Sequence, residues 1–378
     1  MLEKTISPES PLSRLVECWP AALVAFIVSV IATRLCEKIA PRLGIVDKPD
    51  NLVKTHGKTT PYLGGIAIFL GILFGMLVSF AFVPERYYGS VAFRWGFGIL
   101  AAGAIASVIG ALDDIFDIRP WQKITGQVAA AVILVAVGIT PKVYSLAGPV
   151  GLVIDTAFVI VFVLGATNSL NLLDGLDGLC AGVTAIMTVG MMALGALMAV
   201  QYEDPANVGW LRFVLCLTQL SAVCGFLIFN YPRRGGARIF MGDAGSLLLG
   251  LNMAVLMILF AEEKLQFWLG SIVIFGLPIL DTAIAFARRF INKRPLFIPD
   301  RGHIYDQMVD AGLAVKKTVN LCYVFSAGYA LAGVAVSQLP LLWAIVASCA
   351  VAVTSWLIVW RKGYLKMAGI RGAGSPKV

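Results

Sequence analysis

Charged residues are scarce in this chain. They make up 14% of its 378 residues, whereas hydrophobic residues make up 59% and the mean hydropathy is +0.85. A soluble domain carries roughly 25% charged residues. So little charge would leave a soluble fold without enough polar surface to face water. The shortage therefore excludes an ordinary soluble domain and requires that much of the chain face lipid.

Other familiar signals are missing too. The seven cysteines show no CxxC or disulfide spacing and lie mostly in apolar runs, so they are given no role. There is no internal repeat, and no hydrophilic stretch is long enough for a separate soluble domain. Despite the net charge of +8, no soluble basic face exists, so nucleic acid is not an expected partner.

Long apolar runs are what the chain does have. A spanning helix needs about 20 mainly apolar residues. Candidate spans lie near 16–36, 63–83, 95–112, 124–141, 150–168, 180–201, 210–230, 244–261, 265–287, 319–338 and 340–360. The sequence thus predicts an all-α, polytopic integral membrane protein with about eleven transmembrane helices, forming a single catalytic domain over residues 1–378.

Basic residues predict the orientation. Arg34, Lys38 and Arg42 follow the first apolar run, acidic residues precede it, and no signal-peptide cleavage site is evident. The positive-inside rule then places the N-terminus outside and the C-terminus in the cytoplasm. Most of the 30 Lys and Arg residues fall in the loops that this orientation makes cytoplasmic. We expect a multi-pass protein of the inner (plasma) membrane, in contact with membrane lipids.

The aspartates gather at the cytoplasmic ends of the spans. They are Asp113, Asp114, Asp117, Asp174, Asp177, Asp243 and Asp281. An ionisable group at membrane depth is costly and by default indicates function. The alternative is that each Asp caps a helix or pairs with a nearby Arg. That explanation suits an isolated residue such as Asp155 better than a group converging on one face.

Asp113 and Asp114 are adjacent, so their carboxylates repel and call for a cation nearby. Either Mg²⁺ or a basic side chain would serve. Lys123 begins the next span after a short turn and could return to the same pocket as a phosphate ligand. The alternative for Lys123 is snorkelling to the lipid headgroups.

The segment 168–179 is the most informative in the chain. Asn168, Asn171 and Asp174 recur every three residues, near one helix face, and two Asp-Gly pairs then break the helix. Glycine lets the backbone approach a ligand closely. An EF-hand is rejected, because its 12-residue ligand spacing and terminal Glu are missing.

Two further cytoplasmic segments carry candidate residues. Phe240 to Ser246 opens the eighth span with Asp243 at a helix N-terminus, where amides and dipole favour phosphate. In the loop 288–317, Arg301 and His303 lie farther from the membrane edge, and an Arg fork suits phosphate oxygens. The charge on Arg288, Arg289, Lys293 and Arg294 is explained by the positive-inside rule alone.

In order along 40–315, these motifs resemble the polyprenyl-phosphate N-acetylhexosamine-1-phosphate transferase superfamily, glycosyltransferase family 4. The matching segments are Thr60–Gly65, Asp113-Asp114, Lys123, Asn168–Leu179, Asn230-Tyr231-Pro232, Phe240–Ser246, Pro278–Thr282 and Pro299–His303. Any one match is weak, whereas the ordered set on one membrane face is strong. The catalytic loops are expected at 40–62, 113–123, 168–179, 230–246 and 288–317.

The resemblance implies roles residue by residue. It implies catalytic roles for Asp113, Asp114, Lys123, Asp174, Arg301 and His303, substrate-binding roles for Asn168, Leu176, Asp177, Asn230 and Phe240, and metal-binding roles for Asp243 and Asn171. The metal would be Mg²⁺, with Mn²⁺ as a substitute. Leu176 and Asp177 match a uracil-recognition turn, and Phe240 matches an aromatic residue that stacks on uracil.

The implied reaction transfers a sugar 1-phosphate, most simply GlcNAc 1-phosphate, from a UDP-sugar to undecaprenyl or another polyprenyl phosphate. UMP leaves, and the step would open a cell-envelope polysaccharide or glycoconjugate pathway. Many members carry a histidine run where this chain reads His303-Ile304-Tyr305-Asp306, so it resembles the GlcNAc branch more closely. A phospho-MurNAc-pentapeptide transferase is the alternative within the family. Direct displacement or a covalent aspartyl-phosphate, and monomer or homodimer, are left open.

A transporter of phosphorylated solutes is the rival from another class. Transporters place their sites near the bilayer midplane, on broken helices and often between repeated halves. Here the polar residues crowd one membrane edge and no repeat is visible. This pattern favours chemistry on a soluble donor at the membrane surface.

Overall fold

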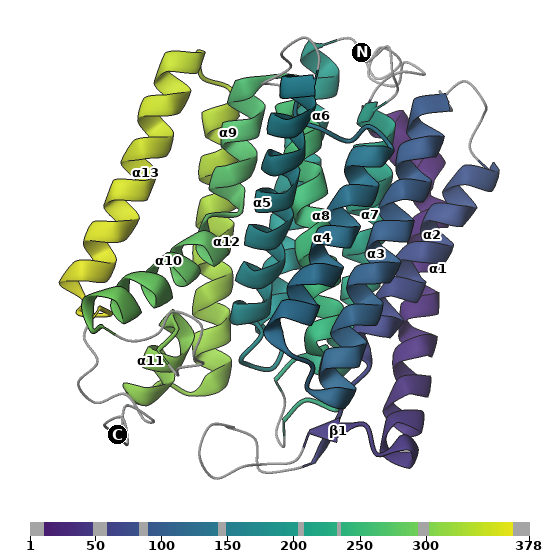
Figure 1. Ribbon diagram of the computed structural model, residues 1–378, viewed down its shortest axis with the longest axis vertical. Coiled ribbons are helices and arrows are strands. Elements are labelled where there is room, and N and C mark those ends of the chain that lie inside the picture. The colour runs from purple at the N-terminus through teal and green to yellow at the C-terminus, as the bar shows by residue number, and fades with distance from the viewer. Residues whose placement is uncertain are drawn as a thin grey trace.

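The computed structural model describes residues 11–47, 59–82, 90–142, 149–202, 208–232, 236–293 and 302–365. Its elements are α1 (Pro11–Ile39), η2 (Ala40–Leu43), β1 (Val46–Asp47), β2 (Thr60–Pro61), α2 (Gly64–Phe82), α3 (Ser90–Phe116), α4 (Pro120–Ala136), α5 (Pro149–Leu173), α6 (Leu179–Gln201), α7 (Val208–Asn230), α8 (Gly242–Ala261), α9 (Leu265–Ile274), α10 (Gly276–Ile291), α11 (Ile304–Asp310), α12 (Val315–Ser337) and α13 (Leu341–Arg361). Figure 1 shows the long helices running roughly parallel in one bundle.

The all-α prediction is confirmed. Within the described residues the only strands are β1 and β2, an antiparallel pair of two residues each. Nine helices of the described chain are long and apolar enough to cross a membrane, and the bent pair α9 and α10 is either a tenth, broken span or a re-entrant loop. The remaining predicted span, 124–141, corresponds to α4, which has 17 residues and is not among these candidate spans. It extends about 25 Å, near the lower limit for a spanning helix.

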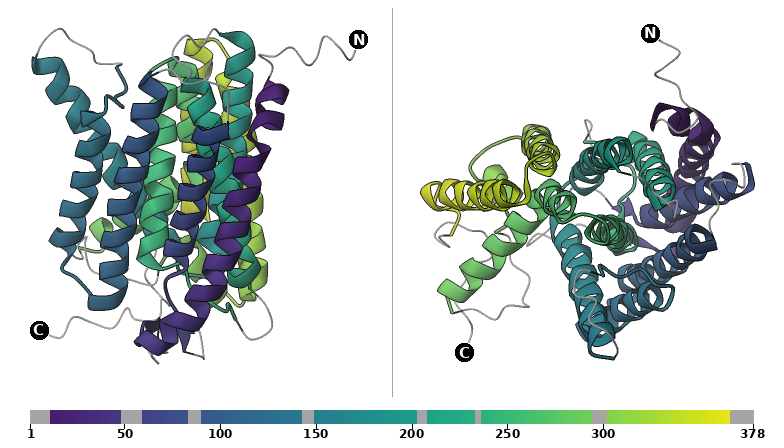
Figure 2. Two further views of the ribbon diagram at one scale, coloured as in Figure 1. Left: turned by 90° about the vertical axis from the view of Figure 1, so that its right-hand side faces the viewer. Right: turned by 90° about the horizontal axis from the view of Figure 1, so that it is seen from above.

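The ninth predicted span is broken instead of continuous. Where one helix was expected over 265–287, α9 and α10 meet at 65°. Pro278 lacks the N–H that a continuous helix would donate to the carbonyl of Ile274, so the chain turns there. As a result α10 runs obliquely away from the bundle, and α13 stands beyond it (Figures 1 and 2).

α8 is the central element, and the apolar stretch of this helix is completely buried in the bundle. α2, α3, α5 and α7 pack around it. Its first turn is held especially tightly. A Cβ on Gly65 would lie 2.0 Å from the Gly245 nitrogen, and one on Gly110 would lie 2.3 Å from the Ala244 nitrogen. Neither contact leaves space for a side chain, so α2 and α3 approach the start of α8 backbone to backbone.

The ends of α3, α5 and α7 meet the starts of α4, α6 and α8 at one end of the bundle. The β1–β2 pair lies at the same end, at the bottom of Figure 1. There the Phe240 amide donates to the Pro61 carbonyl at 2.8 Å, and the Gly64 amide donates to the Phe240 carbonyl at 3.1 Å. The first cytoplasmic loop predicted from the sequence is thereby tied to the start of α8.

Candidate functional site

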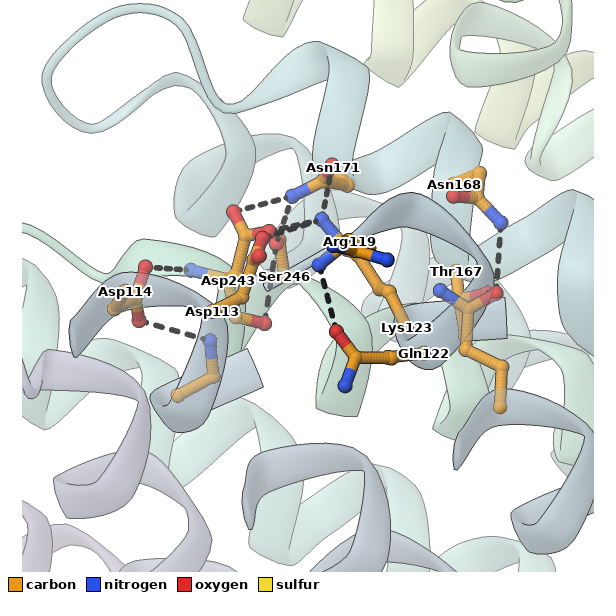
Figure 3. A network of polar contacts seen from close by, with 12 residues as sticks. Asp113, Asp114, Arg119, Gln122, Lys123, Thr167, Asn168, Asn171, Asp243 and Ser246 are labelled. Atoms are coloured by element: carbon orange, nitrogen blue, oxygen red, sulfur yellow. Dashed lines mark hydrogen bonds and ion pairs between the residues drawn. The ribbon is translucent and has the colours of Figure 1, made fainter. Parts of the chain in front are cut away.

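Lys123 is the centre of a polar network at this end of the bundle (Figure 3). Its Nζ lies 3.1 Å from Asp113 Oδ2 and 3.2 Å from Asn171 Oδ1, and it also contacts the carboxylate of Asp243. Four helices, α3, α4, α5 and α8, thus converge on one ammonium group. The side chain of Lys123 is only 15% exposed, so this is a buried contact and not a snorkelling lysine.

Local sequence explains why Lys123 turns back toward Asp113. Pro120 occupies the first position of α4, where its missing N–H costs nothing. The Arg119 amide donates to Gln122 Oε1 at 2.9 Å, which fixes the first turn. Because only residues 117–119 separate α3 from α4, the lysine faces the carboxylate ten residues before it, as the sequence predicted.

Asn171 links the lysine to α8. Its Nδ2 donates to Asp243 Oδ1 at 2.7 Å and lies 3.0 Å from Ser246 Oγ. The amide therefore presents its oxygen to Lys123 and its nitrogen to Asp243. The sequence indicates Ser246 only as the last residue of the segment Phe240–Ser246. The structure shows that its fully buried side chain also belongs to the polar network.

Asp114 caps α8. Its Oδ1 accepts from the Asp243 amide at 2.8 Å and its Oδ2 accepts from the Ala244 amide at 3.2 Å. The first amides of a helix have no partners within the helix, and its N-terminal dipole favours negative charge. Both oxygens of Asp114 thus hold the start of α8 in place. Its expected role beside a lipid phosphate stays a prediction.

Asp174 stands apart from its neighbours. In the described part of the chain its carboxylate has no hydrogen bond or ion pair. Burial raises the pKa of Asp174 well above its usual range, and the nearby carboxylates of Asp243, Asp114 and Asp177 raise it further. A half-buried carboxylate close to three others favours a proton or an incoming cation.

A divalent cation fits the oxygens around Lys123. No three His, Cys, Asp or Glu side chains of the described residues form a ready-made metal site. The side-chain oxygens of Asp113, Asn171 and Asp243 nevertheless point at one position. In this structure the ammonium group of Lys123 occupies that position, which a metal ion could take instead. Hard oxygen ligands suit Mg²⁺, which commonly binds through one or two carboxylates plus substrate phosphates. The donor set therefore matches magnesium.

The turn after α5 carries the residues expected to read uracil. Leu176 is buried, and Asp177 Oδ2 accepts from the Ala237 amide at 2.7 Å. Asn230 accepts from the Gly178 amide and donates to the Ile239 carbonyl, both at 2.9 Å. The amide of Asn230 is therefore engaged in joining this turn to the segment before α8, so any effect on the nucleoside would be indirect.

Phe240 lies beside a tyrosine that the sequence did not single out as a site residue. Its ring centroid is 6.0 Å from that of Tyr62. Burial raises the pKa of Tyr62 above its usual range, and the charge of Asp47, to which its hydroxyl is hydrogen-bonded, raises it further. Asp47 ends β1 and Tyr62 directly follows β2, so the β1–β2 pair lies beside Phe240 at the start of α8. Stacking of Phe240 on uracil stays a prediction.

Asn168 points toward α4. Its Nδ2 donates to Gln127 Oε1 and to the Leu164 carbonyl, each at 2.8 Å. Gln127 is 1% exposed and lies one turn beyond Lys123. The sequence missed Gln127 because it is a single polar residue inside an apolar run. The Asn168–Gln127 pair fixes α5 against α4 next to the lysine.

His303 reaches the same end from the other side of the bundle. It is 5% exposed, and its Nδ1 lies 2.6 Å from Oδ2 of Asp281, a fully buried residue of α10. The hydroxyl of Tyr305 donates to the Leu172 carbonyl at 2.8 Å, next to Asn171. Arg301, the other residue predicted from this loop, lies outside the described residues.

The chain is similar to known proteins over most of its length. A model of glycosyl transferase family 4 matches residues 96–261. The chain is 32% identical over 321 residues to the probable undecaprenyl-phosphate N-acetylglucosaminyl 1-phosphate transferase of Bacillus subtilis, covering 80% of this chain and 81% of that protein. It is 33% identical over 328 residues to the decaprenyl-phosphate N-acetylglucosaminephosphotransferase of Mycobacterium tuberculosis, covering 80% and 78%. The undecaprenyl-phosphate alpha-N-acetylglucosaminyl 1-phosphate transferase of Escherichia coli is 27% identical over 324 residues, covering 82% and 81%.

Proposed function

This chain belongs to glycosyl transferase family 4, and we propose that it transfers N-acetylglucosamine 1-phosphate from UDP-N-acetylglucosamine to a polyprenyl phosphate. The observation that carries the proposal is the convergence of Asp113, Asn171 and Asp243 on Lys123 at one end of a membrane bundle. A lipid acceptor and a water-soluble donor can meet only at such a surface.

The reaction is a phosphoryl transfer. A phosphate oxygen of the lipid attacks the β-phosphorus of UDP-N-acetylglucosamine, and the bond from that phosphorus to the bridging oxygen of UMP breaks. UMP leaves with that oxygen, and the lipid keeps a diphosphate linked to the sugar. A phosphate monoester is mostly dianionic at pH 7, so the attacking group needs little help from a base.

Charge neutralisation and alignment are the main demands, because two anions must approach each other. Lys123 would contact phosphate oxygens of the donor in exchange for its contacts with the carboxylates. Arg301 would add a planar two-pronged grip on the diphosphate. Phe240 would stack on uracil beside the turn of Leu176 and Asp177.

Magnesium would be held by Asp243 and Asn171, with Asp113 within reach of the same point. When bound, it would neutralise charge on the phosphates. Mn²⁺ is the expected substitute. The remaining ligands would come from water and from the donor, as is usual for Mg²⁺ in phosphoryl transfer.

Direct displacement is favoured over a covalent aspartyl-phosphate. Both oxygens of Asp114 accept amide hydrogens of α8, so attack by either oxygen would uncap that helix. Asp113 is ion-paired to Lys123, which weakens it as a nucleophile. The lipid phosphate itself is the better attacking group.

The orientation follows the basic residues. The site end of the bundle carries Lys38, Arg42 and Arg361 on the described helix ends, and the positive-inside rule makes this end cytoplasmic. Cytoplasmic UDP-N-acetylglucosamine would then reach the site directly. We place the protein in the inner (plasma) membrane, at the first membrane step of a cell-envelope polysaccharide or glycoconjugate pathway.

A donor panel tests the proposal. Protein purified in lipid nanodiscs is given undecaprenyl phosphate, Mg²⁺ and either UDP-N-acetylglucosamine, UDP-N-acetylgalactosamine or UDP-MurNAc-pentapeptide, and UMP release is measured. We expect release with UDP-N-acetylglucosamine, dependent on the lipid, and none with the pentapeptide donor. Robust transfer from UDP-MurNAc-pentapeptide with UDP-N-acetylglucosamine inert would contradict the assignment. UMP release without the lipid would indicate a hydrolase.

A further inference from the structure

The start of α11 is held on α10 by two buried side chains. Asp281 Oδ1 accepts from the Ile304 amide at 2.7 Å, while Oδ2 lies 2.6 Å from His303 Nδ1. Two turns farther along α10, Arg288 Nη1 donates to the Gly302 carbonyl. Both Asp281 and Arg288 are 0% exposed. The three residues 302–304 are therefore fixed one by one against a single helix.

The same segment is tied to the site. The His303 and Tyr305 rings stack with centroids 5.4 Å apart and planes within 6°. The Tyr305 hydroxyl donates to the Leu172 carbonyl, and a Cβ added to Gly175 would lie 2.2 Å from that hydroxyl. Leu172 directly follows Asn171, so Tyr305 joins the His303 segment to the stretch of chain that carries Asn171 and Asp174.

A carboxylate acts only as a hydrogen-bond acceptor, whereas a neutral imidazole carries one N–H and one lone pair. Because Asp281 is 0% exposed and its Oδ1 already accepts from a backbone amide, the 2.6 Å contact of its other oxygen requires a hydrogen on Nδ1. We propose that Asp281 is a positioning residue that keeps a proton on Nδ1 of His303, so that Nε2 carries the lone pair of the neutral ring.

This inference rests on the proposed function for its catalytic meaning, but not for its first test. The chain has only two histidines, His56 and His303, so the variant His56→Gln leaves one imidazole to observe. In ¹⁵N-histidine-labelled His56→Gln protein in nanodiscs, NMR should show a protonated Nδ1. In His56→Gln with Asp281→Asn, the ring should move toward the Nε2–H form. An unprotonated Nδ1 with intact Asp281, or identical spectra for the two proteins, would overturn the proposal.

Kinetics then test whether Asp281 acts through His303. Loss of a group that orients a functional histidine costs about 10–100-fold, by analogy with partners of metal-bound histidines. We expect Asp281→Asn to lower kcat/KM by that factor, and to have no further effect when added to His303→Ala. Additive losses in the double variant would show that Asp281 acts by another route and would overturn the proposal.

Two further variants keep the result interpretable. Asp281→Glu retains the charge, so it should retain the Nδ1 proton even if Asp281→Asn folds poorly. Loss of that proton in folded Asp281→Glu would contradict the proposal. Asp155→Asn makes the same chemical change at a buried position of α5 and should alter neither spectrum nor kinetics. If the wild-type protein shows no transferase activity at all, the NMR result still decides the role of Asp281.

Discussion

The two ends of the helix bundle carry charge in different ways. At the end opposite the site, two acids of the described chain are each paired with a cation: Lys142 pairs with Glu262, and Arg212 lies 3.4 Å from Glu263 and donates to the Leu259 carbonyl at 3.0 Å. At the site end, the single ammonium of Lys123 is shared by Asp113 and Asp243.

The difference separates a structural contact from a binding site. A balanced pair completes its own interactions and holds helices together. At the site end, Asp174 also remains without a hydrogen-bonding partner in the described chain, and Asp114 adds a further carboxylate. Such an excess of negative charge is costly in a low-dielectric setting and favours an incoming cation. The excess of carboxylates is therefore the observation that supports the proposed magnesium and phosphate site.

The largest effect is expected at Asp243. Asp243→Asn removes a charged oxygen from the cluster without changing its shape, and should lower kcat by at least about 10²–10³-fold, the cost of losing a key transition-state electrostatic contact. Glu263→Gln, just beyond the other end of α8, is the matched control and should stay near wild-type activity. Near-wild-type turnover by Asp243→Asn at limiting Mg²⁺ would show that the metal assignment is wrong.

Lys123 should come next. Lys123→Met leaves the carboxylates of Asp113 and Asp243 without their shared cation, and activity should fall about 10²-fold through loss of a phosphate contact. The variant should also gain more thermal stability from added Mg²⁺ than the wild type does, because no ammonium competes with the metal. Lys142→Met serves as the control from the opposite end, where no such gain is expected. An equal gain in thermal stability from Mg²⁺ in wild type and Lys123→Met would show that the Lys123 ammonium does not compete with the metal ion for the same position.

Asp174 should show opposite effects on activity and stability. Burial raises its pKa, so the folded state binds a proton more tightly than the unfolded state does. Stability is then lost as pH rises from the unfolded value of about 3.9 toward the raised folded value. Asp174→Asn should therefore melt at a higher temperature than wild type at pH 7.5, with the gain shrinking toward pH 5. Its activity should fall about 10-fold or more. A lower melting temperature at pH 7.5 would contradict the unpaired state of Asp174.

The smallest effect on catalysis is expected at Arg212. Arg212→Ala removes a 3%-exposed side chain with its bonds to Leu259 and Glu263, and should destabilise the protein by about 2–4 kcal/mol. The kcat/KM per folded molecule should change less than about twofold, because Arg212 lies at the opposite end of the bundle and its hydrogen bonds involve no site residue. Denaturation in detergent and active-site-normalised kinetics measure the two quantities. A large loss of kcat/KM in folded protein would show that the two ends of the bundle affect each other. It would contradict the contrast between a structural ion pair and a binding site.

The sequence predicted the site better than it predicted the path of the chain. Asp113, Lys123, Asn171 and Asp243 were all identified, because charged and amide residues at span ends are rare in an apolar chain. Their direct contacts in the structure agree with the expected convergence. The helix ends were less certain, since hydropathy cannot distinguish a helix that ends at residue 112 from α3, which continues to Phe116.

What the sequence missed depends on tertiary geometry. The pairing of Asp281 with His303 requires the bend before α10, and the hydropathy of 265–287 showed only one continuous apolar run. Gln127 and Tyr62 are single polar or aromatic residues without a pattern, so only their neighbours in space reveal them. Pro278 was the one local signal that could have predicted the break.

The central claim is that the β-phosphate of the donor moves with the sugar to the lipid. Single-turnover reaction with UDP-N-acetylglucosamine labelled with ³²P in the β-phosphate tests it most directly. In the presence of undecaprenyl phosphate and Mg²⁺, the label should enter the lipid phase in equal amount to the UMP released, and Asp243→Asn should prevent both. Label that stays in the water phase, as free phosphate or as N-acetylglucosamine 1-phosphate, would contradict the account.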